Sequence, residues 1–410
     1  MNHIYKMVLK VVFLSVVAWG IPAWAQLQVS GFADSYHALR IKAPNEFLSS
    51  RNRLRLEAKT DFDNTNLFVS LNARHNGSLP EQTGIELREA YFDYISDNWD
   101  VRIGRQIIIW GKADGLRITD VISPYDLTEF LARDYDDIRM PVDAFMLRFL
   151  REVMDIELIW LPIFQSGILP GSGNPWVPGL PDFSSYSSVD ITNPQYPEKT
   201  VENSEFGGRI ALYLPGVDVA ISSFYTWNDL PLFNTHVSDD AFSVSQDFYR
   251  YTCIGADFSM SLSDFILRGE AAFYIDEQFS AQNPQYGIFK RNSLTALLGL
   301  DWYPGNDLSV SVQIIDDFII NYHKQIADDE HSCLSTLNIS KNLLRNTLKL
   351  STFVYTSLGK SNMFNRSSVD YALTDEMHLL AGYDIFNGNS GMFGQFKDNS
   401  EVWVKAKYSF

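Results

Sequence analysis

The chain has 410 residues, of which 46% are hydrophobic and 14% aromatic, and its formal net charge at pH 7 is −17. This acidic balance argues against nucleic acid as a partner, because binding a polyanion requires a surplus of lysine and arginine. No segment after the N-terminal region reaches the roughly 18 uninterrupted apolar residues of a transmembrane helix. We expect no metal site and no cofactor, since no ligand cluster or cofactor-binding motif occurs.

Residues 1–25 have the pattern of a signal peptide. Lys6 and Lys10 give a positive start, residues 11–17 form a short apolar core, and the small residues of Ala23-Trp24-Ala25 suit cleavage before Gln26. We therefore expect an exported protein whose mature chain, 26–410, forms one unit.

From Gln26 onward the chain alternates apolar and polar residues with a period of two, which is typical of strands with one apolar face. The alternation predicts 18 strands, with 16 as the alternative count. Their expected ranges are 27–39, 52–62, 65–75, 84–95, 98–109, 142–151, 153–161, 204–214, 217–227, 246–260, 263–275, 289–303, 307–321, 330–344, 346–358, 366–374, 376–386 and 399–410.

The connections between these strands are of two kinds. Links from even to odd strands are short and carry turn residues, such as Asp63-Asn64 and Pro215-Gly216, and one such turn is expected at Ser261-Leu262. Nearly every link from an odd to an even strand is long. Short turns at one rim and long loops at the other are typical of an all-β, antiparallel transmembrane barrel, with the short turns on the periplasmic side. A soluble sandwich with Greek-key connections is the alternative, but it would not keep this rule along the whole chain.

The two faces of the predicted strands differ as such a barrel requires. In the strand 52–62, Leu54, Leu56 and Ala58 alternate with charged residues that would face the interior. The basic residues expected to line the lumen are Arg53, Arg55, Lys59 and, on the next strand, Arg74.

One internal stretch resembles a known group. Gly104-Arg105-Gln106 followed by Trp110-Gly111, and then Pro124 with Asp126, resembles the GRQ…WG and P-x-D segments of a broad group of Gram-negative outer-membrane proteins of unknown function. Porins and hydrophobic-substrate uptake proteins are better-studied relatives of such barrels, so the resemblance implies a channel-like role and assigns no substrate.

Arg105 is exceptional within this motif. It shares the strand face of Val101 and Ile103, which would point it toward lipid, and we expect a bulge in that strand or a pairing with Glu89 to resolve the conflict.

The link 110–141 is long and contains many apolar residues, so it is expected to have a function rather than to be disordered. We expect it to fold inward as a constriction, with a helix over 126–132; a cap over the outer mouth is the alternative. Its acidic residues Asp114, Asp120, Asp134 and Asp137 would face the basic wall and set a transverse field across a pore. Alternatively, these charges form salt bridges that plug a narrow barrel.

Two further segments complete the prediction. The link 162–203 is expected to be a long extracellular loop pinned by its aromatic residues, although these could also stack on sugar rings. The last strand ends at Phe410, and Tyr408 and Phe410 resemble the assembly signal of bacterial outer-membrane proteins, which implies recognition by the barrel assembly machinery.

The sequence as a whole predicts an outer-membrane channel of the porin type for a small or medium solute, surrounded by outer-membrane lipid and lipopolysaccharide. A non-conducting surface protein that binds a glycan or a partner through its loops is the main alternative. A hydrolase on the barrel wall is a minor one, and no enzyme is expected, since nucleophile-elbow, zinc-protease and phosphate-loop motifs are absent from the sequence.

Overall fold

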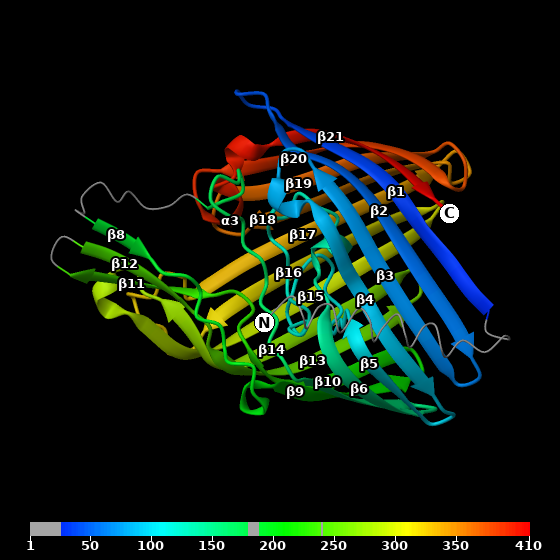
Figure 1. The fold of residues 1–410 in the computed structure, drawn as a ribbon, viewed down its shortest axis with the longest axis horizontal. Coiled ribbons are helices and arrows are strands. Elements are labelled where there is room, and N and C mark those ends of the chain that lie inside the picture. The colour runs from blue at the N-terminus through cyan, green and yellow to red at the C-terminus, as the bar shows by residue number, and fades with distance from the viewer. Residues whose placement is uncertain (1–25, 179–187, 239–240) are drawn as a thin grey trace.

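The computed structural model describes residues 26–178, 188–238 and 241–410, so the predicted signal peptide lies outside the described residues. The described chain forms a closed antiparallel barrel of 18 strands (Figure 1). The first strand, β1 (Gln26–Arg40), pairs with the last, β21 (Glu401–Ser409), and this pairing closes the sheet. The predicted fold and the count of 18 strands are confirmed.

The other sixteen barrel strands follow one another around the wall, each hydrogen-bonded to the next. They are β2 (Phe47–Phe62), β3 (Thr65–Asn76), β4 (Gly84–Ile95), β5 (Trp99–Gln106), β6 (Val142–Arg151), β7 (Met154–Leu161), β9 (Glu205–Leu214), β10 (Val217–Trp227), β13 (Arg250–Leu262), β14 (Phe265–Ser280), β15 (Ile288–Gly305), β16 (Leu308–Ile319), β17 (His331–Leu343), β18 (Leu348–Ser357), β19 (Asn362–Ala372) and β20 (Met377–Gly388).

Several strand boundaries differ from the prediction by a few residues, and three of the differences bear on the connections. β5 ends at Gln106 instead of residue 109, because the chain leaves the wall there. The segment predicted as one strand from residue 246 is divided, since β13 begins only at Arg250. The turn expected at Ser261-Leu262 lies two residues later, where Ser263 adopts a positive φ of 54°.

The long connections leave the barrel at the rim opposite to the short turns, and they contain structure that alternation did not reveal. β8 (Ser188–Ile191), β11 (Leu232–Ser238) and β12 (Ala241–Asp247) form a separate three-stranded sheet beyond the barrel, on the left in Figure 1. Short helical turns lie in the same connections: η1 (Pro80–Gln82), α2 (Tyr135–Ile138), η2 (Val201–Asn203), η3 (Pro284–Tyr286), α3 (Gly391–Gly394) and η4 (Lys397–Asn399).

Apolar side chains cover the outer wall. Leu54 and Leu56 are exposed on β2, whereas Arg53, which precedes them, is buried in the interior. This inversion, with apolar residues outside and charged residues inside, matches a wall solvated by lipid. No helix in the described part of the chain is long and apolar enough to cross a membrane.

The seam of the barrel is closed at its end by the C-terminal residue. The backbone N–H of Gly31 donates to the carbonyl of Phe410 and that of Phe410 donates to Gly31, both at 3.0 Å. The rings of Tyr408 and Phe410 stack on the outer surface with centroids 6.3 Å apart. Both residues of the predicted assembly signal therefore face outward, and their recognition by an assembly machinery remains a prediction.

Candidate functional site

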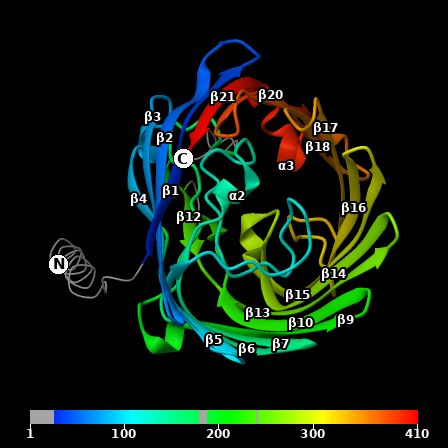
Figure 2. The same ribbon diagram turned by 90° about the vertical axis from the view of Figure 1, so that its right-hand side faces the viewer.

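The most prominent internal feature is the segment between β5 and β6, residues 107–141, which we call the lumen loop. Figure 2, which looks along the barrel, shows it with α2 inside the ring of strands. It contacts the wall of β6, β7, β10 and β13–β16 on one side, and β2 and β18–β21 on the other. It therefore crosses the interior from wall to wall.

The chain turns inward at the Gly104-Arg105-Gln106 motif. Gly104 has a φ of 130°, and a Cβ atom there would lie 2.3 Å from the carbonyl oxygen of Ala90, so a larger residue would be strained. Gln106 is fully buried and donates to the carbonyl of Ala144 at 3.2 Å. The next N–H, of Ile107, no longer joins the β4 ladder, because it donates to the Glu89 carboxylate at 3.0 Å.

Arg105 shows how the outward-facing arginine is accommodated, and it corrects the expectation of a bulge or a Glu89 partner. Its side chain stays on the outer face and its guanidinium lies 3.4 Å from the Asp143 carboxylate of β6. Its Nε also donates to the Leu87 carbonyl of β4 at 3.1 Å, where β5 has ended and the ladder offers no N–H. Arg105 thus caps a free strand edge.

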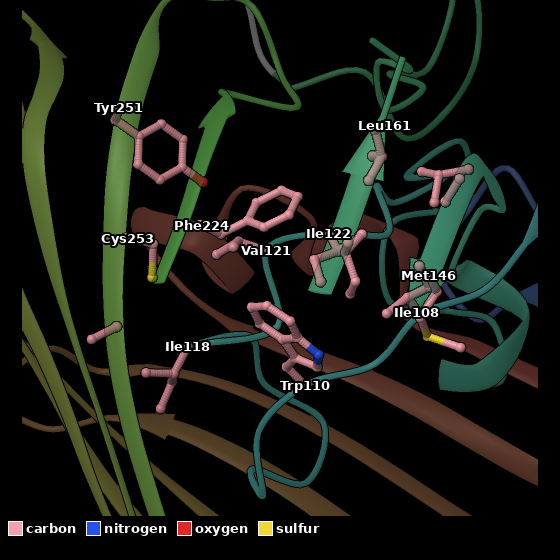
Figure 3. Close-up of a cluster of buried hydrophobic side chains, with 14 of the residues drawn as sticks. Ile108, Trp110, Ile118, Val121, Ile122, Met146, Leu161, Phe224, Tyr251 and Cys253 are labelled. Atoms are coloured by element: carbon pink, nitrogen blue, oxygen red, sulfur yellow. The ribbon is translucent and has the colours of Figure 1, made fainter. Parts of the chain in front are cut away.

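An apolar cluster anchors the first half of the lumen loop to the wall (Figure 3). The ring of Trp110 packs edge-on against Phe224, with centroids 5.7 Å apart, and its indole N–H donates to Glu157 at 2.5 Å. Other members from the loop are Ile108, Ile118, Val121 and Ile122, and members from the wall include Met146, Leu161, Tyr251 and Cys253. Inward-facing apolar side chains are unusual in a water-filled barrel, and here the loop covers them.

A buried carboxylate on β14 holds the turn that follows Trp110. Glu270 accepts the backbone N–H groups of Lys112, Ala113 and Thr119 at 2.7–2.9 Å, and also the Thr119 hydroxyl at 2.7 Å. Gly111 has a φ of 93°, and a Cβ atom there would lie 2.4 Å from the Glu270 carboxylate, so this close approach requires glycine. Sequence reasoning missed Glu270, which has no local signal beyond its inward position.

The Pro124 and Asp126 part of the motif forms turns, and the helix predicted over 126–132 is wrong. Asp126 N–H donates to the Ile138 carbonyl and Met140 N–H to the Pro124 carbonyl, both at 2.8 Å, so the chain doubles back on itself. The Asp126 carboxylate binds the Thr128 N–H and, at 2.7 Å, Arg133. Burial would raise the pKa of Asp126, but Arg133 and Thr128 outweigh it and lower this pKa.

Two predicted basic residues meet one predicted acidic residue directly. The Asp137 carboxylate of α2 lies 2.7 Å from Arg53 and 3.1 Å from Arg55, and all three side chains are largely buried. Arg53 also donates to Asp34. Burial opposes the charged form of Asp137, yet the arginines hold its pKa well below the ordinary range.

Asp134 pairs on the same side of the barrel with residues that the sequence had not singled out. One carboxylate oxygen lies 2.7 Å from the Lys405 ammonium, and the other lies 3.6 Å from the Arg366 guanidinium. Burial acts against its charge, but Lys405 and Arg366 prevail and lower the pKa of Asp134 to about 2. The Asp134 side chain nevertheless remains 49% exposed.

The remaining predicted site residues make their ion pairs elsewhere. Asp120 pairs with Arg139 of the loop itself at 2.7 Å, and Asp114 pairs with Arg268 of β14 at 2.6 Å. On the wall, Lys59 lies 3.1 Å from Asp61 and Arg74 lies 3.0 Å from Glu86. The structure thus brings Arg53 and Arg55 to Asp137, and it does not bring Lys59 or Arg74 to an acidic residue of the loop.

A second apolar cluster joins the lumen loop to the outer mouth. Phe130 of the loop packs against Phe396 with ring centroids 4.6 Å apart, and Trp176 of the 162–203 connection packs against Phe386 at 5.4 Å. Phe364 and Phe386 each lie two residues from an inward-facing charged residue, Arg366 and Asp384, and so share its face, a signal by which their position could have been found.

Toward the short-turn rim the interior wall is hydroxyl-rich. Four inward-facing serines lie side by side across β16–β19 and form two hydrogen-bonded pairs, each at 2.8 Å. This serine row consists of Ser309, Ser340, Ser351 and Ser368. Within residues 26–178, 188–238 and 241–410, no group of three or more histidine, cysteine or acidic side chains is placed to hold a metal ion.

Comparison with known proteins supports the architecture alone. No protein-family model and no curated protein sequence matches the chain. Among solved structures, OccK11 (OpdR) of Pseudomonas aeruginosa aligns with a TM-score of 0.55 and 8% identity, over 94% of this chain and 96% of the other. The outer membrane channel DcaP of Acinetobacter baumannii aligns with a TM-score of 0.47 and 12% identity, over 96% and 99% of the two chains. At 8% identity, the similarity to OccK11 shows a shared barrel fold.

Proposed function

We propose that the protein is a channel of the bacterial outer membrane, in which the lumen loop is a fixed constriction that admits small solutes. The observation that carries this proposal is the arrangement of the interior. The loop is pinned to opposite walls, while the wall nearer the short turns presents the serine row to the lumen. An 18-stranded barrel has the circumference for an aqueous lumen, so the loop would set its narrowest point.

The contacts of the loop favour a permanent constriction over a mobile gate. Its charged residues Asp114, Asp134 and Asp137 each pair with a wall residue, and its apolar residues are buried against both walls. Opening would require these groups to lose their partners together, which is costly for Asp137 and the two arginines it contacts because all three are largely buried. We therefore propose a narrow passage that favours small solutes, and we propose no enzymatic activity.

The second candidate is a non-conducting surface protein. The pairing of Arg53 and Arg55 with Asp137, and the aromatic cluster around Trp176 at the mouth, would both suit a plug. The three-stranded sheet β8–β12–β11 beyond the barrel would then present the binding surface.

Conductance in planar lipid bilayers separates the two candidates. The refolded protein should give small, stable conductance steps, and a variant with residues 112–138 replaced by a short Gly-Ser linker should give several-fold larger steps because the lumen is cleared. Silence of the unmodified protein at all voltages, together with conduction by the shortened variant, would establish a plugged barrel and reject the channel.

A further inference from the structure

A cavity of about 220 Å³ lies between the lumen loop and the wall of β18 and β19. Its lining includes Tyr135 and Asp134 from the loop side and Phe353, Tyr355 and Phe364 from the wall. We propose that this loop cavity is a binding subsite for a solute that joins a single aromatic ring to an ammonium group. A role of this subsite in transport rests on the proposed channel function, but binding of the solute can be measured without transport.

The size and the walls of the cavity suit one ring. A cavity of roughly 150 Å³ lined by apolar side chains binds benzene, so 220 Å³ holds a ring with a short substituent. The rings of Phe353 and Tyr355 lie 4.7 Å apart, and Tyr355 and Phe364 stack at 5.9 Å. Such an aromatic wall offers both apolar contact and ring faces that attract a cation.

The aromatic wall is held in place independently of any solute. The Tyr355 hydroxyl donates to the Gly115 carbonyl at 2.7 Å, and the Tyr135 hydroxyl donates to the Leu116 carbonyl at 3.0 Å. These bonds fix the ring planes and tie the loop to β18. The cavity is therefore preorganised, which limits the entropy lost on binding.

The charge that a solute can reach in this cavity is negative. The side chain of Asp134 is 49% exposed, whereas those of Arg366 and Arg133 are 17% and 3% exposed. Arg366 forms an ion pair with Asp384 at 3.2 Å and lies over the Trp403 ring, and Arg133 forms an ion pair with Asp126. An ammonium group would meet the carboxylate directly, whereas a solute carboxylate would meet Asp134 before either arginine.

Asp134 also has an acceptor position that no hydrogen bond from the described residues occupies. Lys405 occupies one of its oxygens at 2.7 Å, while the other lies 3.6 Å from Arg366, beyond hydrogen-bond length. An ammonium placed between this oxygen and the ring faces would add a charge-assisted bond and a cation–π contact. Both parts of the proposed solute are thereby matched to the cavity.

Titration calorimetry of the full-length barrel in detergent micelles tests the proposal, with benzylamine as the probe and benzoate and butylamine as comparisons. Benzylamine should bind saturably, and the other two at least about tenfold more weakly, since each lacks one of the two matched groups. Asp134→Asn should weaken benzylamine binding at least about tenfold. Phe353→Leu, which leaves every ion pair intact, should weaken benzylamine binding severalfold. This variant tests the proposal if Asp134→Asn does not fold.

Asp329→Asn is the matched control. Asp329 is 50% exposed and paired with a lysine, Lys360, as Asp134 is with Lys405, but it lies in a rim connection and does not line the cavity. The Asp329→Asn variant should bind benzylamine as tightly as the unmodified protein does. Equal binding of benzoate and benzylamine, or unchanged binding in both Asp134→Asn and Phe353→Leu, would overturn the subsite. Saturable binding in a protein that is silent in bilayers would instead reject the channel and leave the subsite standing.

Discussion

At the scale of single residues, the lumen loop depends on side chains that replace backbone partners. Glu270 accepts three backbone N–H groups of the loop, Glu89 accepts that of Ile107, and Arg105 caps the Leu87 carbonyl. Each of these side chains comes from the wall and satisfies a group that the departing chain leaves without a ladder bond. The loop is therefore positioned by a few wall residues, and replacing one of them should disturb the position of the whole loop.

Glu270→Gln is the sharpest of these replacements. The glutamine side chain would replace one carboxylate oxygen with an N–H₂ group that faces N–H donors of the loop. The two hydrogen bonds accepted by that oxygen would be lost, and the facing donors would repel each other. We expect a loss of about 1–3 kcal/mol in the free energy of unfolding and noisier conductance steps. Thermal unfolding and single-channel recording measure the two effects. Glu376→Gln at the short-turn rim is the control, and equal behaviour of both variants would show that Glu270 does not hold the loop.

At the scale of elements, the barrel is closed by a strand whose outer face is apolar, with Val402, Val404 and Tyr408 exposed on it. β21 pairs with β1 and β20, and beyond its last residue the reciprocal bonds of Gly31 and Phe410 finish the seam. Because closure removes the free edges of the sheet, the last strand decides whether the barrel forms at all.

Deletion of Phe410 should therefore impair assembly before it impairs transport. We expect less folded protein in the outer-membrane fraction, measured by heat-modifiable mobility on gels, while the barrels that do form conduct normally. Phe410→Tyr, which retains the backbone and a ring, should assemble as the unmodified protein does. Normal insertion of the truncated chain would refute a role of Phe410 in assembly.

At the scale of the whole molecule, the lumen loop is held between two walls by apolar contacts and by ion pairs. Apolar clusters lie on both sides, and on the side of β2 and β19–β21 Asp137 also pairs with Arg53 and Arg55, and Asp134 with Lys405 and Arg366. Apolar contact does not depend on pH, but the ion pairs do, so acid should weaken the hold on the loop at these pairs.

The acid response follows from the direction of the pKa shifts. Arg53 and Lys405, against the opposing effect of burial, hold the pKa values of Asp137 and Asp134 below the ordinary 3.8. Their stabilisation is complete above the ordinary value and is lost as pH falls through the folded value, which for Asp134 is about 2. The ion pairs of Asp134 and Asp137 should therefore stay intact from pH 7 to about 4, and conductance should change as they are lost below about 3. A conductance that does not change below about pH 3 would contradict this assignment, and Asp137→Asn should reproduce the acid state at neutral pH.

Much of the wall could be predicted because its determinants are local. A period of two and the turn residues between strands recur within about ten residues, so all 18 strands were found, and Arg53 and Arg55 were placed on the inner face. The same reasoning failed for the helix over 126–132, because Asp126 pairs with Ile138 outside the window in which helical periodicity was read. It also missed the sheet β8–β12–β11, in which β11 and β12 are neighbours in the chain but β8, which pairs with β12, lies far before them.

The sequence by itself thus determined the barrel, its two faces and the segment that enters it. Only the tertiary structure decided where that segment lies, which charges pair and that a cavity remains beside it. The physical reason is the range of the contacts. Tyr355 and Gly115, which close the loop cavity, are 240 residues apart, and Lys405 and Asp134 are 271 apart. Such contacts form only when a closed barrel brings its opposite walls around the loop, and no local pattern encodes them.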